Sequence, residues 1–525
     1  MLTHLYIQVL SALLITSLAA PTDTRINRIR ELQKREDVTG LANVVPAVDV
    51  HTPSWPQWVN ETTRWSSYSA PTFDLIFIPN NEQEISDALV YLSSYNFPFF
   101  TQGGGHGYST TLATIQNAVM IKMERFDYIR MNDDMSATVG GGVRYGALIS
   151  AVHAAGREMT VGSCVCVGST GAMLGGGHGR LQGKHGLGSD ALRSVRMVLW
   201  NGTMIEASKN VNSDLFWGMR GAGHNFGVVI ESTYETFPQE NDGMHYTADM
   251  VFTDDSLESV VGVINSLMPD QDPALAIDLI FFANTTTLTP IVFVNLVYAG
   301  PQAEGQRYAD LFASANSASN TTHYGKRPSN SSSHITRLSI DASEVPFDRL
   351  NNATAGGALT AACATGSRQN TYSANLRSFD VSTIRQLYDS YGDLVKANPL
   401  VAGSLVLFEV FGQKAIQAKP DDYSAYPNRR FTNTLALLEM IYTDDSVGST
   451  ADTWAREWRD TLAMPDVSGY EQQHVYENYA HGDEPLEALY GYDEWRKERL
   501  TRLKNEFDPK DNFDGYHNIP LEGGW

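Results

Sequence analysis

Two glycine-rich segments between Phe99 and Val229 constrain the fold of this chain more than any other feature. The first, from Thr101 to Tyr108, reads TQGGGHGY, and the second runs from Val161 through Cys164 and Cys166 to Gly179. Glycine lets a ligand approach the main chain closely, and successive backbone N–H groups in such loops bind anions. The two segments therefore predict one shared site for a large, phosphate-bearing ligand.

The first loop matches neither of two common nucleotide-binding motifs. No Lys-Ser/Thr pair follows Gly103–Gly105, so the loop is not a P-loop, and the third glycine and following helix of the dinucleotide fingerprint are missing. Taken alone, the loop is equally compatible with a structural turn, and His106 with a buried structural histidine. Whether this loop binds a cofactor therefore depends on which other motifs accompany it along the chain.

The composition favours a secreted globular protein with two or three domains. The chain has 525 residues and a net charge of −22, which opposes binding to nucleic acid and to anionic membranes and fits a solubilising acidic surface. Met1–Ala20 combines a short apolar run with small residues before Pro21, as in a cleaved signal peptide; a retained anchor is the alternative, although the run is short for a membrane span. Six Asn-x-Ser/Thr sequons fit a secretory route, at Asn60, Asn201, Asn284, Asn320, Asn330 and Asn352.

The cysteines predict no disulfide framework. The chain contains only Cys164, Cys166 and Cys363, and residues two apart in an extended segment lie near the upper limit of bridging distance. No Cys/His spacing matches a zinc site, so no metal is expected. The hydrophobic core is expected to supply the stability.

The order of predicted elements indicates an α+β protein. Strands at 74–78 and 97–100 flank a helix that Asn81 caps, with Glu84 at the capping-box position. Further strands are predicted at 117–122, 136–139, 195–200, 203–207 and 227–236, with a helix at 145–155. From Asn241 the pattern predicts an antiparallel sheet covered by helices, with strands at 274–282, 291–298, 404–411 and 434–442 and helices at 257–267 and 383–395. Residues 25–35 indicate an exposed helix or propeptide, 314–333 a glycosylated surface excursion, and 490–507 a charged helix.

Further motifs follow the glycine-rich segments in a fixed order. They are Gly188-Ser-Asp190, Asp214-Leu-Phe-Trp217, Gly221–Val229, Tyr476-Glu-Asn-Tyr479 and Leu503–Pro509. This order resembles the PCMH-type FAD-binding domain of the vanillyl-alcohol-oxidase family. More narrowly, it resembles the berberine-bridge-enzyme-like branch in its fungal secreted form. The resemblance covers about Thr72 to Pro520 and is weakest in the middle.

The resemblance implies an α+β architecture. It consists of a PCMH-type FAD-binding domain of two α+β subdomains and a substrate domain with an antiparallel sheet covered by helices. The expected organisation is a signal peptide (1–20), an N-terminal lead (21–67), the FAD-binding domain (68–240), the substrate-binding domain (241–470), and a C-terminal segment that returns to the FAD-binding domain (471–525).

The resemblance also implies covalently bound FAD. His106 matches the histidine bonded to the flavin 8α-methyl carbon, and Cys164 matches the cysteine bonded to flavin C6 in bicovalent members; Cys166 competes by proximity, and a buried free thiol is the alternative for Cys164. The other expected cofactor-binding residues are Gln102, Gly103, Gly104, Gly105, Gly107, Gly168, Ser169, Gly171, Gly175, Gly176, His178, Gly179, Val228 and Asn478. Ala172 departs from the family pattern, because many members carry a histidine there near the flavin pyrimidine edge. His178 is a candidate to stabilise reduced flavin instead.

Four residues are candidates for the catalytic acid or base: Tyr108, Glu439, Tyr476 and Tyr479. A tyrosine acts as a base only if its pKa falls from about 10. Glu409 and Glu439 both sit in apolar strand patterns, where burial would raise the carboxyl pKa into a range that suits a base. A salt-bridged structural carboxylate is the alternative for Glu439.

These expectations combine into an FAD-dependent oxidase. A base removes a proton from a substrate O–H or N–H while hydride passes to flavin, and O2 reoxidises the flavin to give H2O2. The expected substrate is a secondary-metabolite alcohol, amine or polyketide. Alternatives are a secreted carbohydrate oxidase acting on oligosaccharides, a non-redox isomerase or cyclase with flavin as scaffold, and a flavin-free binding protein. A small molecule and O2 are the expected partners, without nucleic acid and without stable membrane association.

Overall fold

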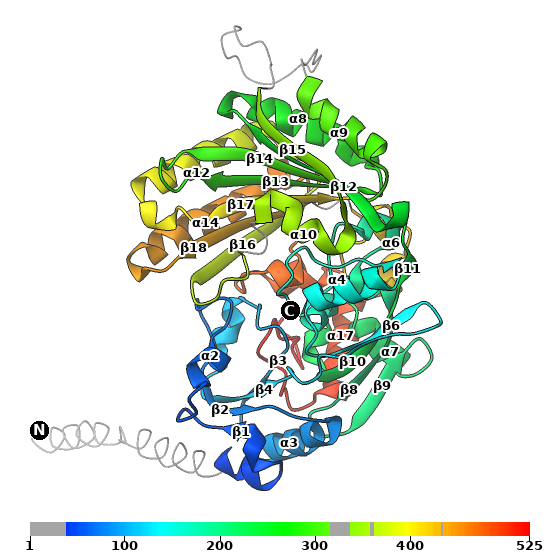
Figure 1. Ribbon diagram of the computed structural model, residues 1–525. Helices are drawn as coiled ribbons and strands as arrows, with labels where there is room; N and C mark the ends of the chain where they lie inside the picture. The colour runs from blue at the N-terminus through cyan, green and yellow to red at the C-terminus, as the bar shows by residue number, and fades with distance from the viewer. Residues whose placement is uncertain (1–37, 315–335, 358–361, 432–433) are drawn as a thin grey trace, which may run out of the picture.

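The computed structural model describes residues 38–314, 336–357, 362–431 and 434–525 (Figure 1). The predicted signal peptide, the segment 25–35 and nearly all of the excursion 314–333, with Asn320 and Asn330, lie outside the described residues. The other four sequon asparagines, Asn60, Asn201, Asn284 and Asn352, are exposed.

The first subdomain is a small sheet with a parallel core. In spatial order it contains β1 (Val50–His51), β2 (Phe73–Phe77), β4 (Ala118–Lys122) and β3 (Phe99–Gln102), and β4 is parallel to both β2 and β3. Helix α3 (Glu82–Tyr95) connects β2 to β3 and begins at Asn81, whose side chain accepts a hydrogen bond from the backbone N–H of Glu84. The predicted helix cap is confirmed. Strand β3 leads directly into the glycines of the first loop.

The second subdomain is a five-stranded antiparallel sheet. Its order is β5 (Ile129–Met131), β6 (Ser136–Gly140), β10 (Val228–Glu235), β8 (Leu192–Val198) and β9 (Met204–Ser208). The strands predicted at 195–200 and 203–207 correspond to β8 and β9, which pair as a hairpin with Ser194 opposite Ser208. Helices α4 (Tyr145–Ala154), α5 (Ser169–Leu174) and α7 (Ser213–Gly218) belong to this subdomain.

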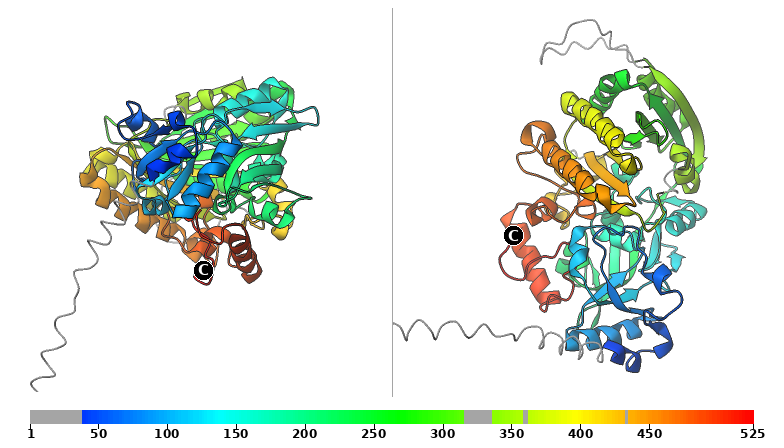
Figure 2. Two further views of the ribbon diagram at one scale, coloured as in Figure 1. Left: turned by 90° about the horizontal axis from the view of Figure 1, so that it is seen from below. Right: turned by 90° about the vertical axis from the view of Figure 1, so that its left-hand side faces the viewer.

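The third layer is a seven-stranded antiparallel sheet. Its order is β15 (Arg337–Pro346), β12 (Met244–Phe252), β14 (Pro290–Tyr298), β13 (Leu275–Ala283), β17 (Leu405–Phe411), β18 (Thr434–Tyr442) and β16 (Arg368–Leu376). Helices α8 (Leu257–Leu267), α9 (Gln302–Ser314), α12 (Val381–Ala397) and α14 (Gly448–Leu462) form one core with its outer face. Its other face is turned toward the FAD-binding subdomains (Figures 1 and 2). The predicted antiparallel sheet covered by helices is confirmed.

Three strands of this sheet were not predicted from the sequence: β12, β15 and β16. Strand β16 reads RQNTYSANL, and it is buried almost throughout although it is mostly polar. Strand β15 is an edge strand whose side chains are mostly exposed. Neither therefore shows the apolar alternation from which strands are predicted.

The C-terminal segment packs against the second subdomain through α17 (Glu494–Phe507) and α7. Helix α17 begins after Asp493 and not at Tyr490, because Gly491 has a φ of +99° that ends the shorter α16 (Leu486–Tyr490). The Arg499 Nε donates a hydrogen bond of 2.7 Å to Asp214 of α7. The remaining short elements are α2 (Trp58–Thr62), the pair β7 (Arg157–Glu158) and β11 (Phe237–Pro238), α6 (Gln182–His185), α10 (Leu350–Ala353), α13 (Lys414–Gln417) and α15 (Pro465–Ser468). Among the residues described, no helix has both the length and the apolar character needed to cross a bilayer.

Candidate active site

A cavity of about 450 Å³ lies where the two glycine-rich segments face the seven-stranded sheet. Its volume is in the range of cofactor and substrate sites. The wall includes all four catalytic candidates and most of the expected cofactor-binding residues: Tyr108, Glu439, Tyr476, Tyr479, Gln102, Gly103, Gly104, Gly105, His106, Gly107, Cys164, Gly168, Gly171, His178, Val228 and Asn478. Four expected residues are not among those that line the cavity: Ser169, Gly175, Gly176 and Gly179. Ser169 is fully buried, and its hydroxyl donates to the Val143 carbonyl at 2.9 Å.

The two glycine-rich segments cross backbone against backbone. A Cβ at Gly104 would overlap the main chain of Gly168, and a Cβ at Gly168 would lie 2.5 Å from the Gly104 nitrogen. No other residue type fits at either position. The crossing joins the loops on one side of the cavity and leaves a glycine-lined wall for a ligand.

Arg64 holds the first loop in place. Its Nη1 donates to Gln102 Oε1 at 2.8 Å, and its Nη2 donates to the Gly107 carbonyl at 3.0 Å. These two bonds span the loop that carries His106. No local sequence pattern indicates this role, because Arg64 lies 38 residues before Gln102.

His106 is neutral and presents its imidazole to the cavity. Burial, with smaller effects of Arg64 and Arg144, lowers its pKa to about 3. Trp65 stacks on its ring with centroids 4.1 Å apart. A neutral, oriented imidazole has a free lone pair for forming a covalent bond.

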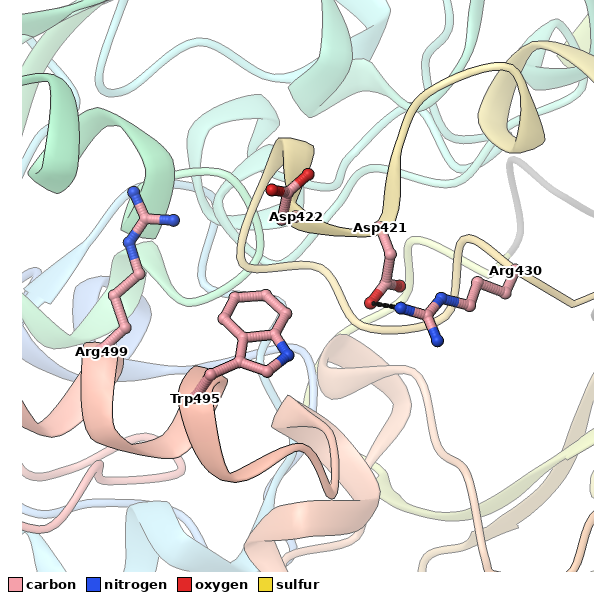
Figure 3. A pocket seen from close by; sticks show the side chains of 5 residues that line it. All are labelled: Asp421, Asp422, Arg430, Trp495 and Arg499. Carbon is pink, nitrogen blue, oxygen red and sulfur yellow. Dashed lines mark ion pairs between the residues drawn. The ribbon is translucent and has the colours of Figure 1, made fainter.

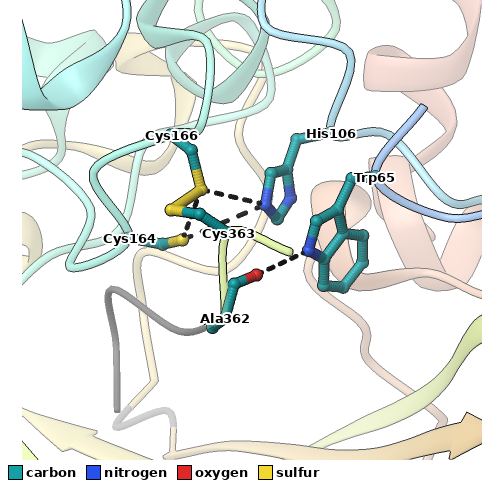
Figure 4. Close-up of a disulfide and its surroundings, with 6 residues drawn as sticks. All are labelled: Trp65, His106, Cys164, Cys166, Ala362 and Cys363. Atoms are coloured by element: carbon teal, nitrogen blue, oxygen red, sulfur yellow. Dashed lines mark hydrogen bonds between the residues drawn. A yellow bond between two sulfur atoms is a disulfide. The ribbon is translucent and has the colours of Figure 1, made fainter. Parts of the chain in front are cut away.

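The prediction of no disulfide was wrong. Cys166 and Cys363 form a disulfide, with Cα atoms 5.7 Å apart (Figure 4). Their separation of 197 residues explains why the sequence did not reveal the pair: the contact exists only once the substrate domain lies on the FAD-binding domain. Cys164 is the free cysteine, so of the two neighbouring candidates it alone keeps a thiol.

The inner face of the seven-stranded sheet supplies the opposite wall. Strand pairing places Leu405 opposite Glu439, Leu407 opposite Leu437 and Glu409 opposite Leu435. Because side chains two residues apart share a face, these side chains point the same way. The cavity wall accordingly contains Ile280, Leu405, Leu407 and Leu437 together with the two carboxylates.

The two carboxylates differ in their hydrogen bonding. Burial raises the pKa of Glu439 to about 7, and no hydrogen bond or ion pair to its carboxylate occurs among the described residues. Glu409 accepts a hydrogen bond of 3.1 Å from the Tyr479 hydroxyl, and burial together with the charge of Asp278 raises its pKa to about 8. Glu439 is therefore the carboxylate that faces the cavity unengaged.

The tyrosine candidates are poor bases in this arrangement. Burial raises the pKa values of Tyr108, Tyr476 and Tyr479 above the ordinary value for tyrosine. The Tyr476 hydroxyl accepts from Asn478 Nδ2 at 2.6 Å and from the Gly177 N–H at 3.0 Å. These residues keep their protons and act as hydrogen-bond donors or structural contacts.

His178 carries no charge toward the cavity. Its Nδ1 lies 2.8 Å from Gln182 Oε1 and its Nε2 lies 2.9 Å from the Tyr426 hydroxyl. Burial lowers its pKa to about 4. A cationic role for His178 beside reduced flavin therefore has no support in this geometry.

The cavity offers unpaired polar groups to a ligand. The buried Tyr108 hydroxyl and Thr101 Oγ1 have no hydrogen-bond partner among the described residues. A buried polar group without a partner is costly. Together with the glycine-lined wall, the neutral His106 and the free Cys164, these groups fit a large cofactor with polar atoms along its length.

Sequence reasoning missed part of the wall. Arg64, Trp65, Ala362 and the apolar residues Ile280, Leu405, Leu407 and Leu437 were not expected at the site. The alternation in β17, where Leu405 and Leu407 share a face with Glu409, was an available signal for these two leucines.

A second pocket carries no comparable chemistry. It is lined by Asp421, Asp422, Arg430, Trp495 and Arg499 (Figure 3) and shares none of these residues with the cavity above. Arg430 pairs with Asp421 at 2.9 Å, and Arg499 pairs with Asp214 at 2.5 Å. These pairs account for both of its arginines as structural contacts.

Known proteins resemble this chain over most of its length. The family described as FAD binding domain matches residues 73–208. The FAD-linked oxidoreductase srdI of Neurospora crassa is 32% identical over 89% of this chain and 89% of its own length. The FAD-linked oxidoreductase OXR1 of Pyricularia oryzae is 33% identical over 88% of this chain and 87% of its own length.

Solved structures share the fold at lower identity. A chitooligosaccharide oxidase superposes with a TM-score of 0.75 at 19% identity, over 93% of this chain and 100% of that one. The glucooligosaccharide oxidase of Acremonium strictum, described with a 6-S-cysteinyl, 8α-N1-histidyl FAD, gives a TM-score of 0.74 at 20% identity, over 91% of this chain and 98% of that one. The predicted PCMH-type architecture is confirmed.

Proposed function

The chain belongs to the PCMH-type FAD-linked oxidoreductases, and on that premise we propose that it is an oxidase of an apolar alcohol or amine of the secondary-metabolite type. The observation that carries the proposal is the cavity wall opposite the glycine-rich loops, where apolar residues surround an unengaged carboxylate. Bound FAD would accept hydride from the substrate and pass the electrons to O2, giving H2O2.

We propose that His106 and Cys164 both attach the flavin. His106 is neutral and oriented by Trp65, and Cys164 is the free cysteine beside it, with Sγ 3.9 Å from His106 Nε2. The same pair of linkages is named for the glucooligosaccharide oxidase of Acremonium strictum. Covalent attachment would fix the ring system relative to the FAD-binding domain, whose loops carry both residues.

We propose Glu439 as the base. A general base works best when its pKa lies near the operating pH, and the pKa of Glu439 is about 7. Glu439 stands on β18 across from Leu405 and lines the cavity with Tyr108. It would remove the proton of the substrate O–H or N–H, while the protonated Tyr108 hydroxyl donates a hydrogen bond to the ligand.

The apolar wall separates the two main substrate classes. An oligosaccharide presents many hydroxyl groups, each of which needs a hydrogen-bond partner when it is buried. Ile280, Leu405, Leu407 and Leu437 supply none. An aromatic or alicyclic alcohol or amine buries apolar surface there at about 25 cal/mol per Å² and needs few polar contacts.

Substrate screening tests this proposal. Holoenzyme would be mixed anaerobically with benzylic and alicyclic alcohols, amines and oligosaccharides, and loss of the oxidised flavin absorbance would be followed. We expect bleaching by members of the first two groups and H2O2 once O2 is admitted. Turnover restricted to oligosaccharides contradicts the substrate class. A product of unchanged mass formed without O2 consumption contradicts the oxidase reaction and favours the isomerase or cyclase alternative.

We further propose that the protein is secreted and N-glycosylated. The signal-like Met1–Ala20 and the exposure of Asn60, Asn201, Asn284 and Asn352 support this. After expression of the full chain in a fungal host, the protein should be found in the culture medium. Its N-terminus should begin after Ala20, and its mass should fall on treatment with an N-glycosidase. Retention in the cells with an intact Met1 contradicts it.

A further inference from the structure

The tip of the substrate domain that carries Ala362 and Cys363 contacts the neighbours of both residues proposed to attach the flavin. The Ala362 carbonyl accepts a hydrogen bond of 2.8 Å from Trp65 Nε1, and Trp65 stacks on His106. The next residue, Cys363, forms the disulfide with Cys166, two residues from Cys164 (Figure 4). We name Trp65, Cys166, Ala362 and Cys363 the attachment clamp.

The sulfur atoms of the three cysteines and the imidazole of His106 lie close together at this tip. Cys164 Sγ lies 3.3 Å from Cys166 Sγ, which is within the separation of reacting atoms in a near-attack arrangement. The His106 Nε2 lies 3.7 Å from Cys166 Sγ and 3.9 Å from Cys164 Sγ. Without the disulfide, two thiols would therefore stand at nearly equal distances from the same histidine.

We propose that the attachment clamp selects Cys164 as the cysteine that bonds to flavin, by holding Cys166 in a disulfide with Cys363. This inference rests on the proposed attachment of flavin to both His106 and Cys164. It adds a reason why Cys164, and not Cys166, bonds to the flavin. Through Trp65 the same tip also fixes the ring plane of His106. One structural element thereby positions both attachment residues.

The geometry also couples the disulfide to flavin attachment. If Cys164 carries no flavin, its thiolate can attack Cys166 Sγ, forming a Cys164–Cys166 bond and releasing Cys363 as a thiolate, with no net oxidation. Only the thiolate attacks, and burial and the charge of Glu439 raise the pKa of the Cys164 thiol, so the exchange is slow at neutral pH. A flavin bond to Cys164 removes the attacking thiolate and so protects the Cys166–Cys363 disulfide from this exchange.

Peptide mapping of wild-type holoenzyme tests the clamp directly. Cleavage after Arg157, Arg180, Arg349 and Arg368 gives peptides 158–180 and 350–368. After deglycosylation and without reduction, we expect these two peptides joined by a bond that dithiothreitol breaks, and flavin on Cys164 through a bond that it does not break. Free thiols at Cys166 and Cys363 overturn the clamp. An intact disulfide with unmodified Cys164 overturns the cysteine attachment and the selection with it, but leaves the proposed oxidase reaction of a His106-bound flavin standing.

Two variants test the selection. In C363S the Cys166 thiol is free, and we expect at least a twofold loss of flavin on Cys164, with the lost share found on Cys166. In the matched C166S/C363S protein no competing thiol exists, and all cysteine-linked flavin should be on Cys164. Wild-type occupancy of Cys164 in C363S overturns the proposal.

A third measurement serves if C363S fails to fold. Wild-type protein produced under riboflavin limitation contains a flavin-free fraction, which can be mapped beside the holoenzyme. We expect the Cys164–Cys166 isomer in the flavin-free fraction alone. Its presence in equal amounts in both fractions overturns the coupling of the disulfide to flavin attachment.

Discussion

Glu439→Gln should abolish most of the activity and at the same time stabilise the protein. The substitution keeps the size of the side chain and removes its ability to accept a proton. Positioned general bases contribute about 10²- to 10⁴-fold to rate, and we expect kcat with the best substrate to fall by about this factor. Flavin content should not change, because Glu439 makes no hydrogen bond within the described part of the chain.

The pH dependence identifies the group. The pKa of Glu439 is about 7, and a base acts only when it is ionised. In wild type, kcat/KM should therefore rise about tenfold per pH unit below pH 7 and level off above it. In Glu439→Gln this rise of kcat/KM with pH should be absent over the same range.

The stability change follows from the same pKa. Burial raises the pKa of Glu439 from 4.5 to about 7, so between these values the folded state binds more protons than the unfolded state and stability falls as pH rises. Converted at 1.36 kcal/mol per pKa unit, the cost is at most about 3 kcal/mol and is fully present above pH 7. Glu439→Gln should thus be more stable than wild type at pH 8, by up to that amount, and no more stable at pH 4.

Unfolding in urea at pH 4 and pH 8 measures this difference, and Glu409→Gln is the matched control. Burial also raises the pKa of Glu409, to about 8, so its amide variant should gain stability at high pH. Glu409→Gln should still show the rise of kcat/KM toward pH 7, because Glu409 is hydrogen-bonded to Tyr479 and is not the proposed base. A Glu439→Gln protein that is destabilised at pH 8 and retains its activity would show a structural ion pair and refute the reasoning.

Three further predictions concern the attachment residues and the fold. His106→Ala should retain its yellow colour after acid precipitation through Cys164, whereas His106→Ala with Cys164→Ala should release all flavin; colour loss in the single variant contradicts attachment at Cys164. Removing the disulfide in C166S/C363S should lower stability by up to about 5 kcal/mol, because it frees a loop closed over 197 residues; an unchanged Tm in non-reducing buffer would show that the cross-link constrains nothing. Asn81→Ala removes the cap bond to the Glu84 N–H and should cost about 1 kcal/mol in urea unfolding, whereas an unchanged midpoint would assign the start of α3 to packing alone.

The sequence predicted what depends on local chemistry. The helix cap at Asn81 follows from residue types and a short spacing, and the two glycine-rich segments predicted a shared ligand site. Glu439 was identified because a carboxylate interrupts an apolar strand. The flavin domain itself was identified from the order of motifs along the chain.

The features that the sequence did not predict depend on contacts between segments that are far apart in the chain. Strand β16 is polar and is buried by its neighbours, so its burial cannot be seen in its own pattern. The Cys166–Cys363 pair forms only when the substrate domain is in place. Arg64 takes part in the site only through Gln102 and Gly107, which belong to a different loop.

The division of the site between two domains explains why such contacts matter for function. The proposed attachment residues lie on loops of the FAD-binding domain, whereas Glu439 lies on the seven-stranded sheet, so the base and the cofactor are aligned only as well as the two domains are. Two contacts hold the domains together near the start of β16. The Ser66 hydroxyl donates a hydrogen bond of 2.8 Å to the Gln369 carbonyl, and Cys363, a few residues before Gln369, forms the disulfide with Cys166. A displacement of about 1 Å costs on the order of 10²-fold in rate. Loosening this connection should therefore lower kcat more than it raises KM, because it disturbs the alignment of Glu439 with the flavin and leaves the apolar binding wall intact.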